Sequence, residues 1–261
     1  MTPDVDHGEL VAAVAGCAAC HTAEGGAPFA GGYAVETTWG TFFGSNLTPD
    51  PVAGLGGWSV EDFSRALRDG RAPDGRRYVP AFPYASFTGL SDGDVADLWA
   101  YLKTIAPDPT PSRPHEARAI ATSPLGLGLW RTLAFRPGVP AADRGDYLVG
   151  AVAHCGECHT PRNSIGRMKA SRAMAGSDDP PAPAPNITPG ALAWTVQDWS
   201  LFLEIGLTPD GDGVGGEMTR VIEQGTSRLS AADRDAIAAS MLRVRAIQPR
   251  RRGQDGPDED G

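Results

Sequence analysis

Two copies of one short pattern constrain this chain of 261 residues more than any other feature. They read Cys17-Ala-Ala-Cys20-His21 and Cys155-Gly-Glu-Cys158-His159. On one turn of helix, this spacing brings two sulfurs to the same edge of a macrocycle and places the following imidazole beneath its metal. The pattern is the attachment signature of a c-type haem. We therefore predict two covalently bound haems, with His21 and His159 as iron ligands.

The four cysteines, which are all the Cys of the chain, also allow other interpretations. A four-thiolate zinc site uses repeated Cys-x-x-Cys pairs, but nothing in it requires His directly after the second Cys. Only 5 of the 261 residues are His, so chance placement at both positions is rare. A thioredoxin-like pair is expected once, near a βαβ pattern. Covalent haem is therefore favoured over zinc, disulfides and dithiol chemistry.

The second half of the sequence repeats the first half at an offset of 136 to 140 residues. Besides the haem motifs, the repeat pairs Asn46-Leu47-Thr48-Pro49 with Asn186-Ile187-Thr188-Pro189, and Trp58-Ser59-Val60-Glu61-Asp62 with Trp194-Thr195-Val196-Gln197-Asp198. A repeat of this length predicts two copies of one structural unit.

Each half predicts three helices joined by long polar loops. The first helix covers 7–20 or 145–158 and ends in the haem motif. The second runs from Ser59 to Arg68 or from Thr195 to Ile205, with Gly70 and Gly206 as stops. The third begins at the cap Ser91 or Ser230. No β-rich run is present, so we expect an all-α fold.

These elements divide the chain into four parts. We predict an N-terminal domain at 1–106, a Pro-rich linker at 107–142, a C-terminal domain at 143–247 and a disordered tail at 248–261. Within the linker, the apolar run 125–135 could contact a membrane or a partner subunit. Packing between the two domains is the favoured alternative.

The chain resembles di-haem cytochromes c related to the cytochrome subunits of membrane-associated alcohol and aldose dehydrogenases. The resemblance covers residues 8–247 and rests on the haem motifs, Asn46-Leu47-Thr48-Pro49, Pro80-Ala81-Phe82-Pro83-Tyr84 and Cys158-His159-Thr160-Pro161-Arg162. It implies two tandem class I cytochrome c domains, each a few helices around a covalently attached haem. It also implies a redox partner such as a quinoprotein, flavoprotein or molybdoprotein dehydrogenase.

Maturation outside the cytoplasmic membrane is a further implication of the resemblance. We therefore expect a periplasmic protein, soluble or peripheral to the inner membrane. Met1-Thr2-Pro3-Asp4 has neither a basic region nor an apolar stretch, so we expect a trimmed sequence or an upstream start. No segment approaches the roughly 20 apolar residues of a membrane span.

The formal net charge of −9 bears on the partners of the protein. Such an acidic chain is poorly suited to bind nucleic acid. Its acidity favours either docking to a basic partner surface or simple solubility, and the two explanations carry equal weight.

The sixth ligand of each iron is expected to differ between the halves. In single-haem relatives, a Met sulfur about 60 residues after the haem His binds the other face of the iron, which raises its potential. Met218 lies 59 residues after His159, so we expect it to ligate the second iron. Three other methionines are weaker rivals, namely Met168, Met174 and Met241.

In the first half the same count falls on Phe82, and a later position used by some relatives falls on Leu90. Neither side chain has a sulfur, so we expect the first haem to lack Met ligation. Tyr78, Tyr84 or His115 could replace it, while a five-coordinate iron is the favoured state.

Three further residues are candidates for the haem propionates. In single-haem relatives a similarly placed Trp donates its indole N–H to a propionate, so the resemblance implies this role for Trp58 and Trp194. The alternative is a Trp that only fills the core. Arg162 follows His159 by three residues and is expected either to pair with a propionate or to be exposed.

Electron transfer is the function that this pattern favours. The chain shows no acid–base or nucleophile constellation, and two haems can pass electrons from a periplasmic dehydrogenase or other donor to a downstream acceptor. The alternative is a di-haem redox enzyme that acts on peroxide, nitrite or a sulfur species at an open first haem. Whether the chain is an enzyme stays open.

Overall fold

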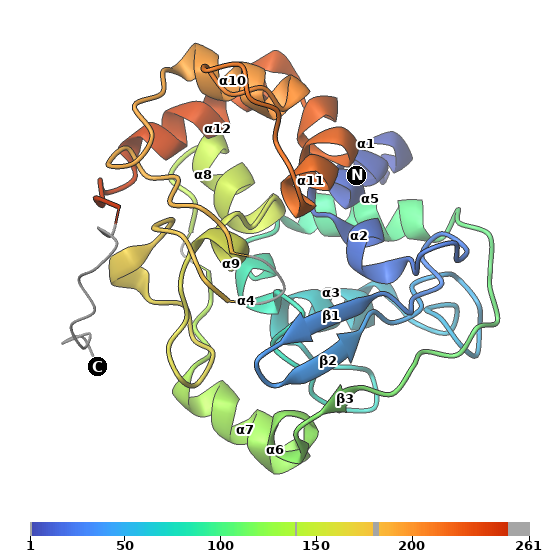
Figure 1. Cartoon of the computed structure of the whole chain (residues 1–261). Coiled ribbons are helices and arrows are strands. Elements are labelled where there is room, and N and C mark those ends of the chain that lie inside the picture. Colours follow the sequence, from blue (N-terminus) through green and yellow to red (C-terminus); the bar gives the residue numbers. More distant parts are fainter. Residues whose placement is uncertain (1, 139, 180–182, 250–261) are drawn as a thin grey trace.

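The computed structural model describes residues 2–138, 140–179 and 183–249 (Figure 1). The helices of the first half are α1 (Val5–Val14), α2 (Cys17–His21), α3 (Val60–Asp69), α4 (Tyr84–Phe87) and α5 (Asp92–Leu102). Those of the second half are α8 (Arg144–Tyr147), the π-helical η1 (Leu148–Val152), α9 (Gly156–His159), the 3-10 turn η2 (Ala170–Arg172), α10 (Val196–Ile205), α11 (Glu217–Gln224), the 3-10 turn η3 (Thr226–Arg228) and α12 (Ala231–Arg243). The predicted tail lies outside the described residues from 250 onward.

The second helix of each half begins and ends where the sequence predicts. Ser59 and Thr195 cap α3 and α10, and each forms a capping box with the Asp three residues later. Gly70 and Gly206 end these helices with φ of 60° and 74°, a backbone conformation that favours glycine. The third helices, α5 and α12, likewise start directly after Ser91 and Ser230.

The first helix of each half is interrupted before the haem motif, which corrects the prediction of one continuous helix. In the first half the break is Gly16, whose φ of 62° ends the run of α1 before α2 begins. In the second half a π-helical turn follows α8, and His154, with a φ of 39°, precedes α9. Each haem motif therefore forms its own short helical turn.

A small sheet corrects the expectation that β structure is absent. Strands β1 (Ala34–Thr37), β2 (Gly40–Phe43) and β3 (Glu116–Ala117) pair antiparallel in the order β1-β2-β3. The first two strands are too short to give a periodic sequence signal. The third belongs to the predicted linker, so the linker completes a sheet of the first half.

The rest of the linker folds as α6 (Ala119–Thr122) and α7 (Pro124–Leu133) at the edge of the molecule (Figure 1). The Trp130 side chain of α7 packs edge-on against Tyr84 of the first half and donates to the carbonyl of Ile165 in the second half. The linker therefore bridges the two halves. Leu125 and Leu129 of the same helix nevertheless stay exposed.

One hydrophobic core runs through both halves of the described chain. It includes buried Val11 and Leu98 of α1 and α5 as well as Leu148 and Ile237 of the second half. In Figure 1 the paired helices α1 and α5 lie beside α11, and α10 packs with α12 at the top of the view. The two copies of the repeat are therefore fused along an apolar interface.

No helix in the described ranges is both long enough and apolar enough to cross a membrane.

Candidate haem sites

The histidines of the two motifs are held in the same way. Nδ1 of His21 donates to the carbonyl of Ser45 at 2.7 Å, and Nδ1 of His159 donates to the carbonyl of Pro185 at 2.9 Å. This bond fixes the tautomer and leaves Nε2 as the lone-pair nitrogen that can bind a metal. Burial lowers the pKa of both histidines, which keeps the rings neutral as ligation requires.

The repeated Asn-x-Thr segments hold these two carbonyls in place. Asn46 Oδ1 accepts from the backbone N–H and hydroxyl of Thr48, and Asn186 Oδ1 accepts from the same groups of Thr188. Both threonines are fully buried. The amide nitrogens of the two asparagines donate to carbonyls that follow the last helix of their own half, at Asp108 and Ile247. The repeat therefore encodes the support of the haem histidine.

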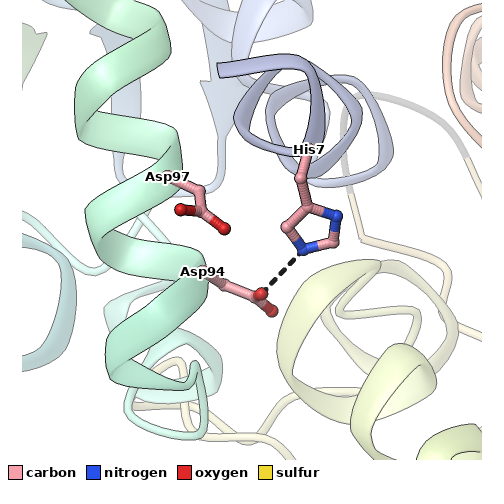
Figure 2. A group of neighbouring side chains, drawn as sticks. All are labelled: His7, Asp94 and Asp97. Atoms are coloured by element: carbon pink, nitrogen blue, oxygen red, sulfur yellow. Dashed lines mark hydrogen bonds and ion pairs between the residues drawn. The ribbon is translucent and has the colours of Figure 1, made fainter. Parts of the chain in front are cut away.

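The four cysteines form no disulfide in the structure. Within the described ranges, one group of three or more His, Cys, Asp or Glu side chains is close enough to hold a metal, namely His7, Asp94 and Asp97 (Figure 2). It contains no Cys, so the four thiols do not converge as a zinc site requires. The free thiols and the fixed histidines fit covalent haem attachment at both motifs.

The His7, Asp94 and Asp97 group joins structural elements. His7 Nε2 lies 2.9 Å from Asp94 Oδ1, as Figure 2 shows, and the Tyr147 hydroxyl from the second half donates to Asp94 Oδ2. Asp97 accepts from the backbone N–H of Asp4. These contacts tie α1 to α5 and both helices to the second half.

Equivalent backbone bonds in the two halves align Met218 with Phe82. The backbone N–H of Tyr78 donates to the carbonyl of Gly70, the residue that ends α3, at 2.8 Å. In the second half the N–H of Val214 donates to the carbonyl of Gly206, the residue that ends α10, also at 2.8 Å. These equivalent bonds fix an offset of 136 residues, which aligns Phe82 with Met218. Both side chains are half-buried and pack against the common core.

The rival Met174 has a different structural equivalent. Its N–H donates to the hydroxyl of Thr160 and its φ is 61°, while the N–H of Phe29 donates to Thr22 and its φ is 60°. Met174 is therefore a buried residue of the loop that follows the haem histidine. Met241 is buried within α12. Neither residue is equivalent to Phe82, and the role of Met218 as the sixth ligand stays a prediction.

Aromatic rings surround Phe82 in the first half. The ring centroids of Tyr78, Phe87 and Tyr84 lie 5.9, 5.7 and 6.2 Å from that of Phe82. Leu90 is buried, as is Leu229 at the matching place in the second half. The position that supplies sulfur in the second half therefore supplies an apolar ring in the first.

The three candidate substitute ligands lie in different surroundings. Burial raises the pKa of Tyr78 and of Tyr84 to about 12. Nδ1 of His115 accepts from the backbone N–H of Phe43 at 3.2 Å, and the ring stacks edge-on against Phe42. With Nδ1 as acceptor, Nε2 of His115 carries the proton and offers no lone pair.

Trp58 and Trp194 are half-buried and pack against the core. Trp194 lies 4.9 Å from Trp199 and 5.0 Å from Phe202, between ring centroids. Among the hydrogen bonds found in the described chain, none involves the indole nitrogen of either residue. Both N–H groups are thus available to a propionate, and this role remains a prediction.

Arg162 is engaged with the second haem motif. Its guanidinium donates to the carboxylate of Glu157 at 2.5 Å and to the backbone carbonyls of Glu157 and Gly166. Glu157 in turn accepts from the hydroxyl of Ser86 in the first half at 2.6 Å. The contacts favour a role for Arg162 in holding the motif turn, and its predicted pairing with a propionate remains untested.

The two motifs lie near one another at the interface of the halves. Burial raises the pKa of the Cys20 thiol, and the nearby Cys158 thiol raises it further. His154 Nε2 donates to the carbonyl of Ala15, which lies two residues before the start of α2 at Cys17. Arg220 of α11 donates to the carbonyl of Ala19 inside the first motif. The sequence alone does not predict these contacts, because no spacing rule links residues that are 139 or 201 positions apart.

Comparison with known proteins identifies the family. The family model described as cytochrome c matches residues 5–106. A protein of Cereibacter sphaeroides named diheme cytochrome c-type is 41% identical over 95% of this chain and 88% of its own length. The chain belongs to the cytochrome c family. It is a di-haem cytochrome with two covalently bound haem c groups, and its function is electron transfer.

Longer relatives also match this cytochrome. The fructose dehydrogenase cytochrome subunit of Gluconobacter japonicus is 37% identical over 94% of this chain and 53% of its own length. The cytochrome c subunit of the quinone alcohol dehydrogenase of Gluconobacter oxydans is 34% identical over 96% of this chain and 57% of its own length. The cytochrome described here therefore spans little more than half of these two proteins.

Proposed function

We propose that this cytochrome is the electron-transfer partner of a periplasmic dehydrogenase and passes electrons through its two haems to a downstream acceptor. One observation carries the proposal, namely that the two haem-attachment turns have the same histidine support and lie beside each other. The names of the longer relatives, as subunits of fructose and alcohol dehydrogenases, support a quinoprotein, flavoprotein or molybdoprotein as donor.

The residue roles belong to the same proposal. Cys17, Cys20, Cys155 and Cys158 attach the haems, His21 and His159 ligate the irons, and Met218 is the sixth ligand of the second iron. When bound, each haem supplies a one-electron redox centre. The chain fixes both imidazoles, keeps them neutral and places the ring of Phe82, which has no donor atom, at the position that aligns with Met218. This asymmetry supports a first iron without a strong sixth ligand.

We also retain the domain division as a proposal, with units at 1–106 and 143–247 joined by the linker at 107–142. The repeated Asn-x-Thr networks support it, because the Asn186 network closes at Ile247 within the second unit and the Asn46 network closes at Asp108, at the start of the linker. The shared core indicates that the units fold as one body. A periplasmic location, soluble or peripheral to the inner membrane, fits the redox compartment that covalent haem attachment needs.

A kinetic experiment tests electron transfer against the enzyme alternative. The purified protein is reduced with a one-electron donor and mixed in a stopped-flow instrument with an oxidised cytochrome c, and separately with peroxide, nitrite or thiosulfate. Electron transfer predicts full and reversible oxidation of both haems by the protein acceptor. Repeated turnover of any small substrate, faster than that of free haem, would contradict the proposal.

A further inference from the structure

Helix α11 joins the two haem sites. It carries Met218, the proposed ligand of the second iron, and two residues later Arg220. Successive residues of an α-helix are about 100° apart around its axis, so these two side chains leave the helix on nearly opposite faces. In Figure 1, α11 lies directly above α2, the first haem-attachment turn. One short helix thus serves both sites.

Arg220 binds the first haem site in two places. Its Nη2 donates to the carbonyl of Ala19, between the two cysteines of the motif, at 3.1 Å. Its Nη1 donates to the hydroxyl of Tyr33 at 3.3 Å, and the guanidinium lies 5.0 Å from the centre of that ring. A planar fork with several donors suits such simultaneous contacts, which a lysine cannot reproduce.

Tyr33 connects this clamp to the support of the haem histidine. The carbonyl of Tyr33 accepts from Gly44, the residue before Ser45, whose carbonyl holds Nδ1 of His21. Gly44 also packs tightly on the motif, since a Cβ there would lie 1.7 Å from the carbonyl oxygen of Cys20. Arg220 therefore contacts both segments that define the proximal side of the first haem.

The charge of Arg220 has a predictable effect at that place. About a third of the side chain is exposed, and its own-helix partner Glu217 lies 3.4 Å away with half of its side chain exposed. A positive charge held beside a redox centre favours the reduced state, which is less positive by one unit. Glu217, being negative and close to the same turn, acts in the opposite direction.

We propose that Arg220 is a positioning residue contributed by the second half to the first haem, where it clamps the attachment turn and raises the potential of that haem. This inference rests on the proposed function and adds a coupling between the halves. It makes the first site incomplete without α11. The residue that anchors the first haem and the residue that ligates the second iron then move as one unit.

The test is a spectroelectrochemical titration of the full di-haem protein in four forms, namely wild type, R220Q, R220K and E217Q. In R220Q we expect the reduction equilibrium constant of the first haem to fall about tenfold, which is 59 mV for one electron. R220K keeps the charge, so the potential of its first haem should fall by less than half as much as in R220Q. E217Q should move the same constant in the opposite direction.

A matched control is R228Q. Arg228 also bridges the halves, through Glu9 of α1 at 2.8 Å, and is about as exposed as Arg220, but it contacts neither motif. Its loss should leave both potentials unchanged. Unchanged first-haem potentials in both R220Q and E217Q would overturn the inference, as would equal shifts in R220Q and R228Q.

The design separates this inference from the proposed function. Wild-type protein that exchanges electrons reversibly while R220Q behaves like wild type refutes only the clamp. Wild-type protein that fails the stopped-flow experiment refutes the function itself. If R220Q does not mature with two haems, E217Q still decides the electrostatic part, because it removes a charge from α11 while keeping Arg220.

Discussion

The two halves of this cytochrome agree on one side of each haem site and differ on the other. The histidine support is the same, down to the carbonyls of Ser45 and Pro185 that hold the imidazoles. On the other side, the repeat aligns Met218 of the second half, the proposed sixth ligand, with Phe82 of the first. The support depends on several groups together, namely backbone carbonyls and a buried Asn-x-Thr network of hydrogen bonds. The sixth ligand depends on one side chain and can change alone.

The proposed difference in the sixth ligand would make the two haems unlike redox centres. A thioether ligand stabilises reduced iron, whereas the phenyl ring of Phe82 has no donor atom. The second haem should therefore take the electron first at equilibrium. Two identical halves would give no such order.

Loss of attachment is the largest expected effect. Replacing Cys155 and Cys158 with Ser should leave a protein with one covalent haem, and replacing Cys17 and Cys20 should do the same at the other site. Each thioether pair belongs to a single motif, so each double variant removes one haem. Mass spectrometry under denaturing conditions counts them. Retention of two haem masses in either double variant would break the assignment.

Replacement of Met218 should have the next largest effect. Met218→Leu keeps the apolar volume but removes the sulfur, so the sulfur–iron charge-transfer band of the oxidised protein should vanish. One potential should fall by on the order of 0.2 V, a quarter of the range that axial ligands span. The matched control is Met174→Leu, a volume-conserving change at a buried loop position, which should keep the band. A band lost in the control and kept in the test variant would reverse the assignment.

The converse substitution sharpens the contrast. Phe82→Met places a sulfur at the position aligned with Met218 by the equivalent bonds of Tyr78 and Val214. The first haem should move toward low spin and gain potential, because the thioether supplies the missing donor. Electron paramagnetic resonance and a redox titration report both changes. An unchanged first-haem signal in a fully haem-loaded variant would argue that another group already binds that iron.

The first haem should also be insensitive to tyrosine ionisation. Burial raises the pKa of Tyr78 from 10.0 to about 12, so its phenol keeps the proton between pH 7 and pH 10, where a free tyrosine begins to lose it. No phenolate should then bind the iron in this range. A pH titration of the ferric spectrum, with Tyr78→Phe as comparison, checks this. A spectral change in wild type that Tyr78→Phe abolishes would identify a tyrosine ligand.

Helix caps should give the smallest effects, and equal ones. Ser59→Ala and Thr195→Ala each remove a capping box and should each lower the free energy of unfolding by about 1 kcal/mol. Chemical denaturation followed by circular dichroism measures both. Because the halves share one core, each variant should unfold in a single transition. A loss confined to one variant, or two separate transitions, would argue against equivalent, fused units.

Much of the helical framework could be predicted from the sequence, because its signals are local. Ser59, Thr195, Gly70 and Gly206 mark helix ends through their own side chains or their lack of one, and the helices begin and end beside them. The breaks before the haem motifs could not be predicted. The apolar pattern around His154 does not predict its positive φ, which depends on packing from both halves.

The candidate sites show the same limit. Cys-x-x-Cys-His motifs and the count to Met218 follow from covalent spacing, so they can be read from the chain. The Arg220 bond to Ala19 and the Ser86 bond to Glu157 join residues of different halves. Such contacts depend on how the two copies of the repeat dock. The short sheet is hidden for a different reason, since its first two strands are short and its third comes from the linker.

Electron paramagnetic resonance of the oxidised protein during a redox titration tests the inequality of the two haems most directly. We predict one low-spin signal typical of His–Met ligation at the higher potential, and a distinct first-haem signal with a high-spin component at a well-separated lower potential. Two low-spin, Met-like signals that titrate together would contradict it.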